Sequence, residues 1–392
     1  MSDATGLLHT VRAKEPLLKT VGPPIQKGST VLLPDAAALY DAPVTYGREG
    51  LASHEALIAG LAALEHAATV KLFPSGVAAL AGALTAVLSA GDEILVTDAI
   101  YKPTRRFCDR VLARFGVTTV YYPPRATAAE IESRLTPRTR LIVMETPGSL
   151  SFEMPDAPAI AAMARARGVL TLIDNTWTAG LYFRPLDHGV DLSVQSLTKY
   201  VGGHSDVFMG SVATNDAKVA ESLKAVVLDF GWAVSPEDAY MMLRGLRTLP
   251  TRLARHDASA RAVARWLSDH PAVGQVIHPA LPQSPDHALW TRDFTGAGGL
   301  FAFTLAPDKA PSPETFLNAL TLFGLGFSWG GFESLALNCD PQFTSRLVSP
   351  DFGGPMIRLS IGLEDPADLI ADLDQALTPW RPRLDSNQQP SA

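Results

Sequence analysis

Lys199 and Asp174 are the residues whose types and positions point most directly to chemistry. A strand-like run, 192–195, leads into Ser196-Leu197-Thr198-Lys199, and Asp174 ends an earlier apolar run, 170–173. Sites on α/β sheets are built where strands end. A lysine amine that can bond to a cofactor aldehyde, together with an aspartate that can pair with a pyridinium nitrogen, is the minimal requirement of pyridoxal-phosphate chemistry. Either residue alone would more simply be a surface lysine or a helix cap, but the pair indicates a cofactor site.

The segment Ser75-Gly76-Val77 predicts an anion site. A strand precedes it and a small-residue helix follows, so bare backbone N–H groups lie at a helix N-terminus, where anions bind. Taken alone, the segment would be an ordinary helix start with Ser75 as the N-cap. Together with the hydroxyls of Ser196 and Thr198, close to Lys199, it offers several hydrogen-bond donors to one phosphate.

Four more residues are candidates for binding. Tyr46 and Arg48 stand two residues apart in a loop-like stretch, where they either recognise a phosphate or are a packed tyrosine and a solvated arginine. Tyr101 follows the strand-like run 94–98 and could stack on a flat heteroaromatic ring. Arg358 interrupts an alternating run, and a buried charge needs a partner, either a structural carboxylate or the α-carboxylate of an amino acid.

The sequence indicates neither a metal site nor a disulfide. His204 and Asp206 have no third ligand nearby, so we expect structural hydrogen bonding and no metal. Cys108 and Cys339, the two cysteines, offer neither a zinc cluster nor a disulfide framework.

The composition of the 392-residue chain predicts a globular protein with two domains. Hydrophobic residues make up 47% and charged residues 19%, which excludes a mainly disordered chain. The net charge of −7 gives no general reason to bind nucleic acid or an anionic membrane. No signal peptide is visible, and no apolar stretch is long enough to span a bilayer, so we expect a cytoplasmic protein.

Alternating patterns indicate an α/β protein. Apolar runs predict strands at 93–97, 117–121, 140–145, 169–173, 192–197 and 210–213, with helices between most of them. This alternation is typical of a parallel or mixed sheet covered on both faces. A long helical region, about 237–269, is expected to break at Pro250. Later runs at 299–305, 334–337 and 356–361, with a helix near 366–377, indicate a smaller α+β domain.

The domain organisation follows from these patterns. We expect an N-terminal arm over residues 1–50, a cofactor-binding α/β domain over 51–245 and an α+β domain over 246–392. The polar tail from about residue 381 is expected to be disordered.

The ordered set of candidate residues resembles the Cys/Met-metabolism group of pyridoxal-phosphate enzymes. The similarity runs through Tyr46-Gly47-Arg48, Ser75-Gly76, Tyr101, Ile173-Asp174-Asn175-Thr176, Ser196 to Lys199, and Arg358 to Gly362. It implies an aspartate-aminotransferase-like (type I) fold, with a large mixed or parallel sheet domain and a smaller C-terminal α+β domain. It also implies pyridoxal 5'-phosphate as the cofactor, an amino-acid substrate, and a homo-oligomer, either a dimer or a dimer of dimers.

The resemblance also implies a role for each candidate. Lys199 would hold the cofactor and shuttle the substrate proton, Asp174 would keep the pyridine nitrogen protonated, and Tyr101 would stack on the ring and help to deprotonate the substrate amine. Arg358 would bind the α-carboxylate with help from Ser328, and Trp329 would shape the pocket wall. The phosphate would be bound by Ser75, Gly76, Val77, Ser196 and Thr198, joined by Tyr46 and Arg48 of a neighbouring subunit.

Two segments, Thr146-Pro147-Gly148-Ser149 and Ser328 to Ser334, resemble the branch of the family that cleaves the Cβ–S bond of L-cystathionine to homocysteine, pyruvate and ammonia in methionine biosynthesis. A broader cysteine-S-conjugate β-lyase, a γ-acting relative such as a methionine γ-lyase, and a non-catalytic binding or regulatory member stay open as alternatives. Val77 and Lys102 depart from the family pattern, and Lys102 adds a cation beside Tyr101 that bears on substrate preference.

Overall fold

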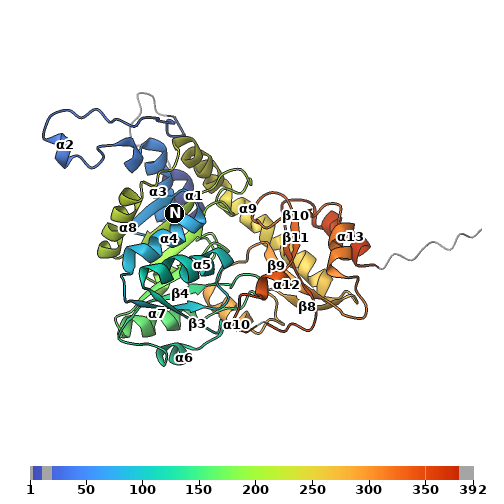
Figure 1. Ribbon diagram of the computed structural model, residues 1–392. Coiled ribbons are helices and arrows are strands. Elements are labelled where there is room, and N and C mark those ends of the chain that lie inside the picture. Colours follow the sequence, from blue (N-terminus) through green and yellow to red (C-terminus); the bar gives the residue numbers. More distant parts are fainter. Residues whose placement is uncertain (1–2, 11–19, 349, 379–392) are drawn as a thin grey trace, which may run out of the picture.

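The computed structural model describes residues 3–10, 20–348 and 350–378, so the tail expected from about residue 381 lies outside the described residues. The described chain forms two β-sheets with helices around them, and an extended arm projects from the first sheet region (Figure 1). The α-helices are α1 (Asp3–Thr10), α2 (Ala38–Asp41), α3 (Ala52–Glu65), α4 (Gly76–Val87), α5 (Lys102–Phe107), α6 (Ala128–Glu132), α7 (Ala157–Ala166), α8 (Ala217–Asp229), α9 (Pro236–Ser268), α10 (His287–Asp293), α11 (Pro313–Ala319), α12 (Asp340–Phe343) and α13 (Pro366–Leu377). Other helical turns are the 3-10 turns η1 (Gly47–Glu49), η3 (Ala113–Phe115) and η4 (Pro185–His188) and the π-helical turn η2 (Cys108–Leu112). The strands are β1 (Thr69–Phe73), β2 (Glu93–Thr97), β3 (Thr118–Tyr122), β4 (Thr139–Glu145), β5 (Leu170–Asp174), β6 (Leu192–Ser196), β7 (Gly210–Thr214), β8 (Val273–Ile277), β9 (Leu300–Leu305), β10 (Gly324–Leu325), β11 (Leu335–Asn338) and β12 (Met356–Ser360).

The first sheet is mixed, as the sequence predicts. Its seven strands have the order β1-β7-β6-β5-β4-β2-β3, and β7 pairs antiparallel with both of its neighbours while the other pairs are parallel. Because parallel strands end at one edge of a sheet, the carboxyl ends of β2, β4, β5 and β6 meet there. Glu145 and Asp174, the last residues of β4 and β5, are direct register partners at this edge.

Alternate residues of the central strands pack against opposite layers of helices. On β4, Leu141 and Val143 join a core with α4 and α8, whereas Ile142 and Met144 join a core with α7. Burial on both faces explains why these strands appear in the sequence as unbroken apolar runs. The predicted and observed strands of this sheet therefore agree to within a residue at almost every end.

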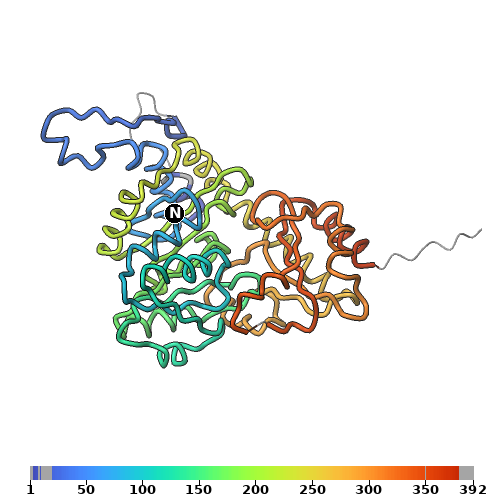
Figure 2. The backbone as a smooth tube through the Cα atoms, in the orientation of Figure 1, coloured from blue at the N-terminus to red at the C-terminus, as the bar shows by residue number. Residues whose placement is uncertain are grey.

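The second sheet has five strands in the order β10-β11-β12-β9-β8, and only the β10–β11 pair is parallel. Phe301, Phe303 and Leu305 of β9 pack against α9, α11 and α13, while Leu300 and Ala302 join the core of the first sheet. The two sheets thus share buried side chains, and the orange to red part of the chain, which forms the second sheet, lies beside the earlier part (Figure 2).

The expected break at Pro250 is wrong, because α9 runs through it as one helix of 33 residues. The side chains around it, Leu246, Leu249 and Leu253, are fully buried against α3 and the first sheet. This packing outweighs the one backbone hydrogen bond that a proline removes. The proposed domain boundary at residue 245 lies within α9, and the division into 51–245 and 246–392 stays a prediction.

Arg252 of α9 holds the turn that follows Lys199. Its guanidinium donates to the carbonyls of Tyr200 (2.7 Å), Val201 (3.2 Å) and Gly245 (2.7 Å). Burial lowers the pKa of Arg252 to about 10, and no carboxylate pairs with it among the described residues. The buried charge is therefore stabilised by backbone dipoles, and α9 fixes the position of the lysine-bearing turn.

We expect Arg252→Lys to lower the free energy of unfolding by about 2–4 kcal/mol, because one ammonium cannot reach all three carbonyls and buried acceptors are left unpaired. Urea unfolding followed by circular dichroism measures this change. The matched control is Arg265→Lys, at an exposed position of the same helix. Equal stability of the two variants would contradict the role given to Arg252.

Candidate cofactor site

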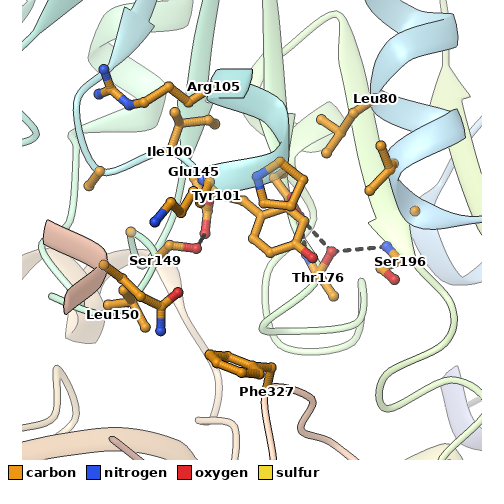
Figure 3. A pocket seen from close by; sticks show the side chains of 18 of the residues that line it. Leu80, Ile100, Tyr101, Arg105, Glu145, Ser149, Leu150, Thr176, Ser196 and Phe327 are labelled. Carbon is orange, nitrogen blue, oxygen red and sulfur yellow. Dashed lines mark hydrogen bonds between the residues drawn. The ribbon is translucent and has the colours of Figure 1, made fainter. Parts of the chain in front are cut away.

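A cavity of about 750 Å³ lies at the carboxyl edge of the first sheet and reaches segments of the second. It brings together eleven of the thirteen residues that the sequence singles out. These are Ser75, Gly76, Val77, Tyr101, Asp174, Ser196, Thr198, Lys199, Ser328, Trp329 and Arg358. Figure 3 shows part of this cavity, with Tyr101 projecting into it near Thr176 and Ser196.

The start of α4 and the end of β6 form an anion cradle. Ser75 is the N-cap of α4, since its hydroxyl accepts from the N–H of Ala78 (3.1 Å). The next N–H groups, of Gly76 and Val77, have no acceptor within the helix. A Cβ on Gly76 would lie 2.5 Å from the Cβ of Ser196, so only glycine allows this approach. The Thr198 hydroxyl already bonds to the backbone of Met209, which leaves Ser196 as the freer hydroxyl donor.

Two carboxylates with different surroundings lie side by side at the sheet edge. Asp174 accepts from the N–H (3.0 Å) and the hydroxyl (2.5 Å) of Thr176, and these bonds oppose the rise in pKa that burial causes. Burial and then the charge of Asp174 raise the pKa of Glu145 well above its usual range. Burial raises the pKa of both carboxyls; the charge of Asp174 adds to this rise at Glu145, whereas the charge of Lys199 favours the ionised form of Asp174.

Lys199 extends into the cavity between the two sheets. Its Nζ donates to the Ser328 hydroxyl (2.9 Å) and lies 5.4 Å from the centre of the Trp329 ring. Gly330 follows with φ of +81°, and a Cβ there would lie 3.2 Å from the Cβ of Lys199. Burial, then the charge of Arg358, lower the pKa of the Lys199 amine to about 8, against the opposite effect of Asp174. About a tenth of this amine is therefore neutral at pH 7, far more than for a lysine with the usual pKa of about 10.4.

Arg358 is a buried cation without a counter-ion among the described residues. Its Nη2 donates to the carbonyls of Phe327 (3.2 Å) and Ser328 (3.0 Å), while its Nε has no hydrogen-bond partner. No described carboxylate pairs with it, so the first of the two partners considered from the sequence, a structural carboxylate, is absent from the residues that the structure describes. A buried, incompletely bonded guanidinium is suited to an incoming carboxylate.

Glu145 and Ser149 are site residues that the sequence reasoning missed. Glu145 accepts from the Ser149 hydroxyl (2.6 Å) and from the N–H of Tyr101 (2.7 Å), as Figure 3 shows for the first pair. Glu145 thereby positions the backbone of Tyr101. It ends an apolar strand just as Asp174 does, so the rule that selected Asp174 would also have selected Glu145.

Tyr46 and Arg48 do not line the cavity of their own chain. They lie in the arm, where the Arg48 guanidinium is 5.0 Å from the centre of the Tyr46 ring and both side chains are exposed. Glu49 orders this loop by accepting from the N–H of Tyr46 (3.0 Å) and the hydroxyl of Thr45 (3.0 Å).

His204, Cys108 and Cys339 do not line this cavity. The ring of His204 bonds to the carbonyl of Gly202 (2.7 Å). No group of three or more possible metal ligands occurs within 3–10, 20–348 and 350–378, and none of the helices described there is long and apolar enough to cross a membrane. Cys108 and Cys339 are buried free thiols.

The chain is similar over most of its length to known enzymes. The model of one family, described as Cys/Met metabolism PLP-dependent enzyme, matches residues 4–378. Cystathionine beta-lyase of Bordetella avium is 43% identical over 364 residues, 90% of this chain and 91% of that protein. Cystathionine beta-lyase MetC of Escherichia coli is 41% identical over 384 residues, 94% and 96% of the two chains. The crystal structure of cystathionine gamma-lyase from Lactobacillus plantarum, complexed with L-serine, has a TM-score of 0.88 at 32% identity and covers 96% of this chain and 98% of its own.

In cofactor-free protein, we expect the acetylation rate of the Lys199 amine to reach half of its high-pH limit near pH 8, because the pKa of this amine is lowered to about 8. Arg358→Met should move this midpoint to higher pH, since the variant removes a repelling charge. In folding terms, protonation of Lys199 disfavours the folded state below about pH 8, and this penalty disappears as the pH rises toward the unfolded value of about 10.4.

Trace acetylation with peptide mass spectrometry over a pH series measures this midpoint. Arg134→Met, at an exposed arginine away from the cavity, is the control. An unchanged midpoint in Arg358→Met would mean that Arg358 does not act on the lysine.

Proposed function

Because the chain belongs to the Cys/Met-metabolism family of enzymes that depend on pyridoxal phosphate, we propose that it is a carbon–sulfur lyase acting on L-cystathionine. The reaction is cleavage of the Cβ–S bond to give homocysteine, pyruvate and ammonia. The observation that carries the proposal is the meeting of Lys199 with Ser328 and Trp329 beside the unpaired Arg358. The names of the Bordetella and Escherichia relatives, both cystathionine beta-lyases, support it.

The residues present fit the cofactor. The N–H groups of Gly76 and Val77 and the Ser196 hydroxyl suit its phosphate, and the Asp174 carboxylate suits its protonated pyridine nitrogen. The Lys199 amine lies in the same cavity, and its lowered pKa suits it to bond with the cofactor. When bound, pyridoxal phosphate supplies an electron sink that makes the Cα–H bond of an amino acid acidic.

Lys199 carries the proton in this proposal. An amine with a pKa of about 8 is matched to proton transfer near neutral pH in both directions. It takes the Cα proton as a neutral amine and, as an ammonium, delivers a proton to the leaving sulfur. Ser328, which accepts from Nζ, helps to orient the amine between these two positions.

Arg358 and Trp329 position the substrate. A carboxylate that accepts two parallel bonds from the Arg358 guanidinium has a fixed orientation, which fixes the Cα–H bond relative to Lys199. Trp329 packs edge-on against Tyr200, with ring centres 5.4 Å apart, and forms an apolar wall that keeps water from the reacting carbons.

The second candidate function is that of a γ-acting enzyme, which the similarity to the Lactobacillus cystathionine gamma-lyase supports. The same lysine, aspartate and arginine would serve either reaction, so the products decide. A non-catalytic member is disfavoured, because a binding protein has no need for Lys199, Asp174 and Arg358 together in one cavity.

We expect purified protein incubated with L-cystathionine to form pyruvate and homocysteine in equal amounts, and borohydride reduction to attach the cofactor to Lys199 in a tryptic peptide. Lys199→Ala should lose activity by at least about 10³-fold, because it lacks the proton carrier. Formation of 2-oxobutyrate and cysteine would instead identify the γ-acting rival.

The arm gives the reason to propose a dimer with shared sites. It carries exposed apolar side chains, among them Leu32, 93% exposed, and Tyr40, 89% exposed, which a second subunit would cover. The arm extends away from the rest of its own chain, and Tyr46 and Arg48 leave their own cavity without the two phosphate contacts that the sequence predicts (Figure 2). We infer that each arm completes the neighbour's site in a symmetric dimer.

Mixing Arg48→Ala and Lys199→Ala subunits in equal amounts should restore about a quarter of wild-type activity after exchange. Half of the dimers are then mixed, and each mixed dimer holds one site free of both changes. Mixing Lys199→Ala with Asp174→Ala is the control, since both residues belong to one chain's site and no intact site forms. Recovery in the control, or none in the test mixture, would contradict the shared site.

A further inference from the structure

One wall of the cavity is unusually basic. Lys102, Arg106 and Arg110 line it, and all three side chains are exposed toward the cavity mouth. They follow each other at intervals of four residues along α5 and η2, so neighbouring cations lie on one face of the helix. Like charges at this spacing destabilise a helix, and a cation in the first turn, such as Lys102, opposes the helix dipole.

Two of these cations have no carboxylate partner among the described residues. Neither Lys102 nor Arg106 takes part in a hydrogen bond or ion pair there, in contrast to Arg105, which is buried and paired with Asp98 at 2.5 Å. Arg105 thus has a structural role that its neighbours do not share. Local rules that are broken without a compensating contact are a mark of functional sites.

The basic wall and Arg358 lie at different depths of the same cavity. Arg358 is buried, whereas Lys102 and Arg106 are at the exposed end. Tyr101, which directly precedes Lys102, lines the same cavity. An amino acid whose α-carboxylate is bound by Arg358 would extend its side chain past Tyr101 toward the mouth.

We propose that Lys102 and Arg106 bind a second carboxylate at the outer end of the substrate, so that the enzyme prefers cysteine thioethers whose sulfur-bound chain ends in a carboxylate. This inference rests on the proposed lyase function and adds the substrate class. The homocysteine part of cystathionine has such a group. Its ammonium would face Asp109, which lines the same wall and accepts from the Tyr121 hydroxyl (2.7 Å).

The test compares three cysteine thioethers that all release pyruvate on β-elimination. S-(3-carboxypropyl)-L-cysteine carries the outer carboxylate, S-(3-carbamoylpropyl)-L-cysteine is its neutral isostere, and S-(4-aminobutyl)-L-cysteine carries a cation. For wild type we expect kcat/KM for the acid to exceed that for the amide by about tenfold or more, mainly through KM. Added salt should reduce this ratio, because the outer charges are exposed.

Lys102→Met/Arg106→Met should bring the acid-to-amide ratio close to one, and Lys102→Glu/Arg106→Glu should shift the preference to the amine. Using the ratio within each variant removes any general loss of activity or folding. Arg114→Met, at an exposed arginine that continues the same helical segment but does not line the cavity, is the matched control and should keep the wild-type ratio.

The outcomes separate the two proposals. A wild-type ratio near one, or a ratio that the double methionine variant leaves unchanged, would overturn the outer carboxylate site while pyruvate release still supports the lyase. If no thioether, including L-cystathionine, yields pyruvate, the lyase function itself fails.

Discussion

Arg358 is a buried guanidinium whose Nε lacks a hydrogen-bond partner, and holding such a charge out of water costs a folded protein stability. That unbalanced charge organises the cavity around it. Burial lowers the pKa of the Lys199 amine and the charge of Arg358 adds to this effect, while Arg358 opposes the rise that burial causes in the pKa of the Tyr101 hydroxyl. The cavity therefore favours the binding of anions, and a ligand with a carboxylate would supply a hydrogen-bonding counter-ion to the Arg358 guanidinium.

The site depends on both sheets, because neither one holds a complete set of groups. The first sheet supplies Asp174 and Lys199, while Ser328, Trp329 and Arg358 belong to the part of the chain that forms the second. The shared hydrophobic core keeps these groups in register, since β9 buries side chains on both sides. An amino acid can therefore bind to Arg358 and Lys199 at once only when the two sheets hold these residues at the right separation.

The sequence predicts the first sheet well because its strands are buried on both faces and form plain apolar runs. β8 and β10 gave no such signal, since Gly274, Gln275 and both residues of β10 are exposed. Asp174 and Lys199 were identifiable because each follows a strand of this kind. The continuation of α9 through Pro250 was not, because it depends on contacts with distant residues of α3. Tyr46 and Arg48 lie away from the cavity of their own chain because of the path that the folded arm takes. The spacing of residues in the sequence does not reveal that path.

α9 is about 50 Å long at 1.5 Å per residue, and this one continuous helix contacts the cores of both sheets. Its first half packs with α3 and its last turns pack on the second sheet, with Pro250 between the two regions. Pro250 removes one backbone hydrogen bond from that turn of α9, which its buried neighbours hold in place. Arg252, two residues further, anchors the turn that follows Lys199. Because Arg252 also donates to the carbonyl of Gly245 in α9, the lysine-bearing turn and this stretch of the helix are bonded together, so a change in the direction of α9 would be passed on to the position of Lys199.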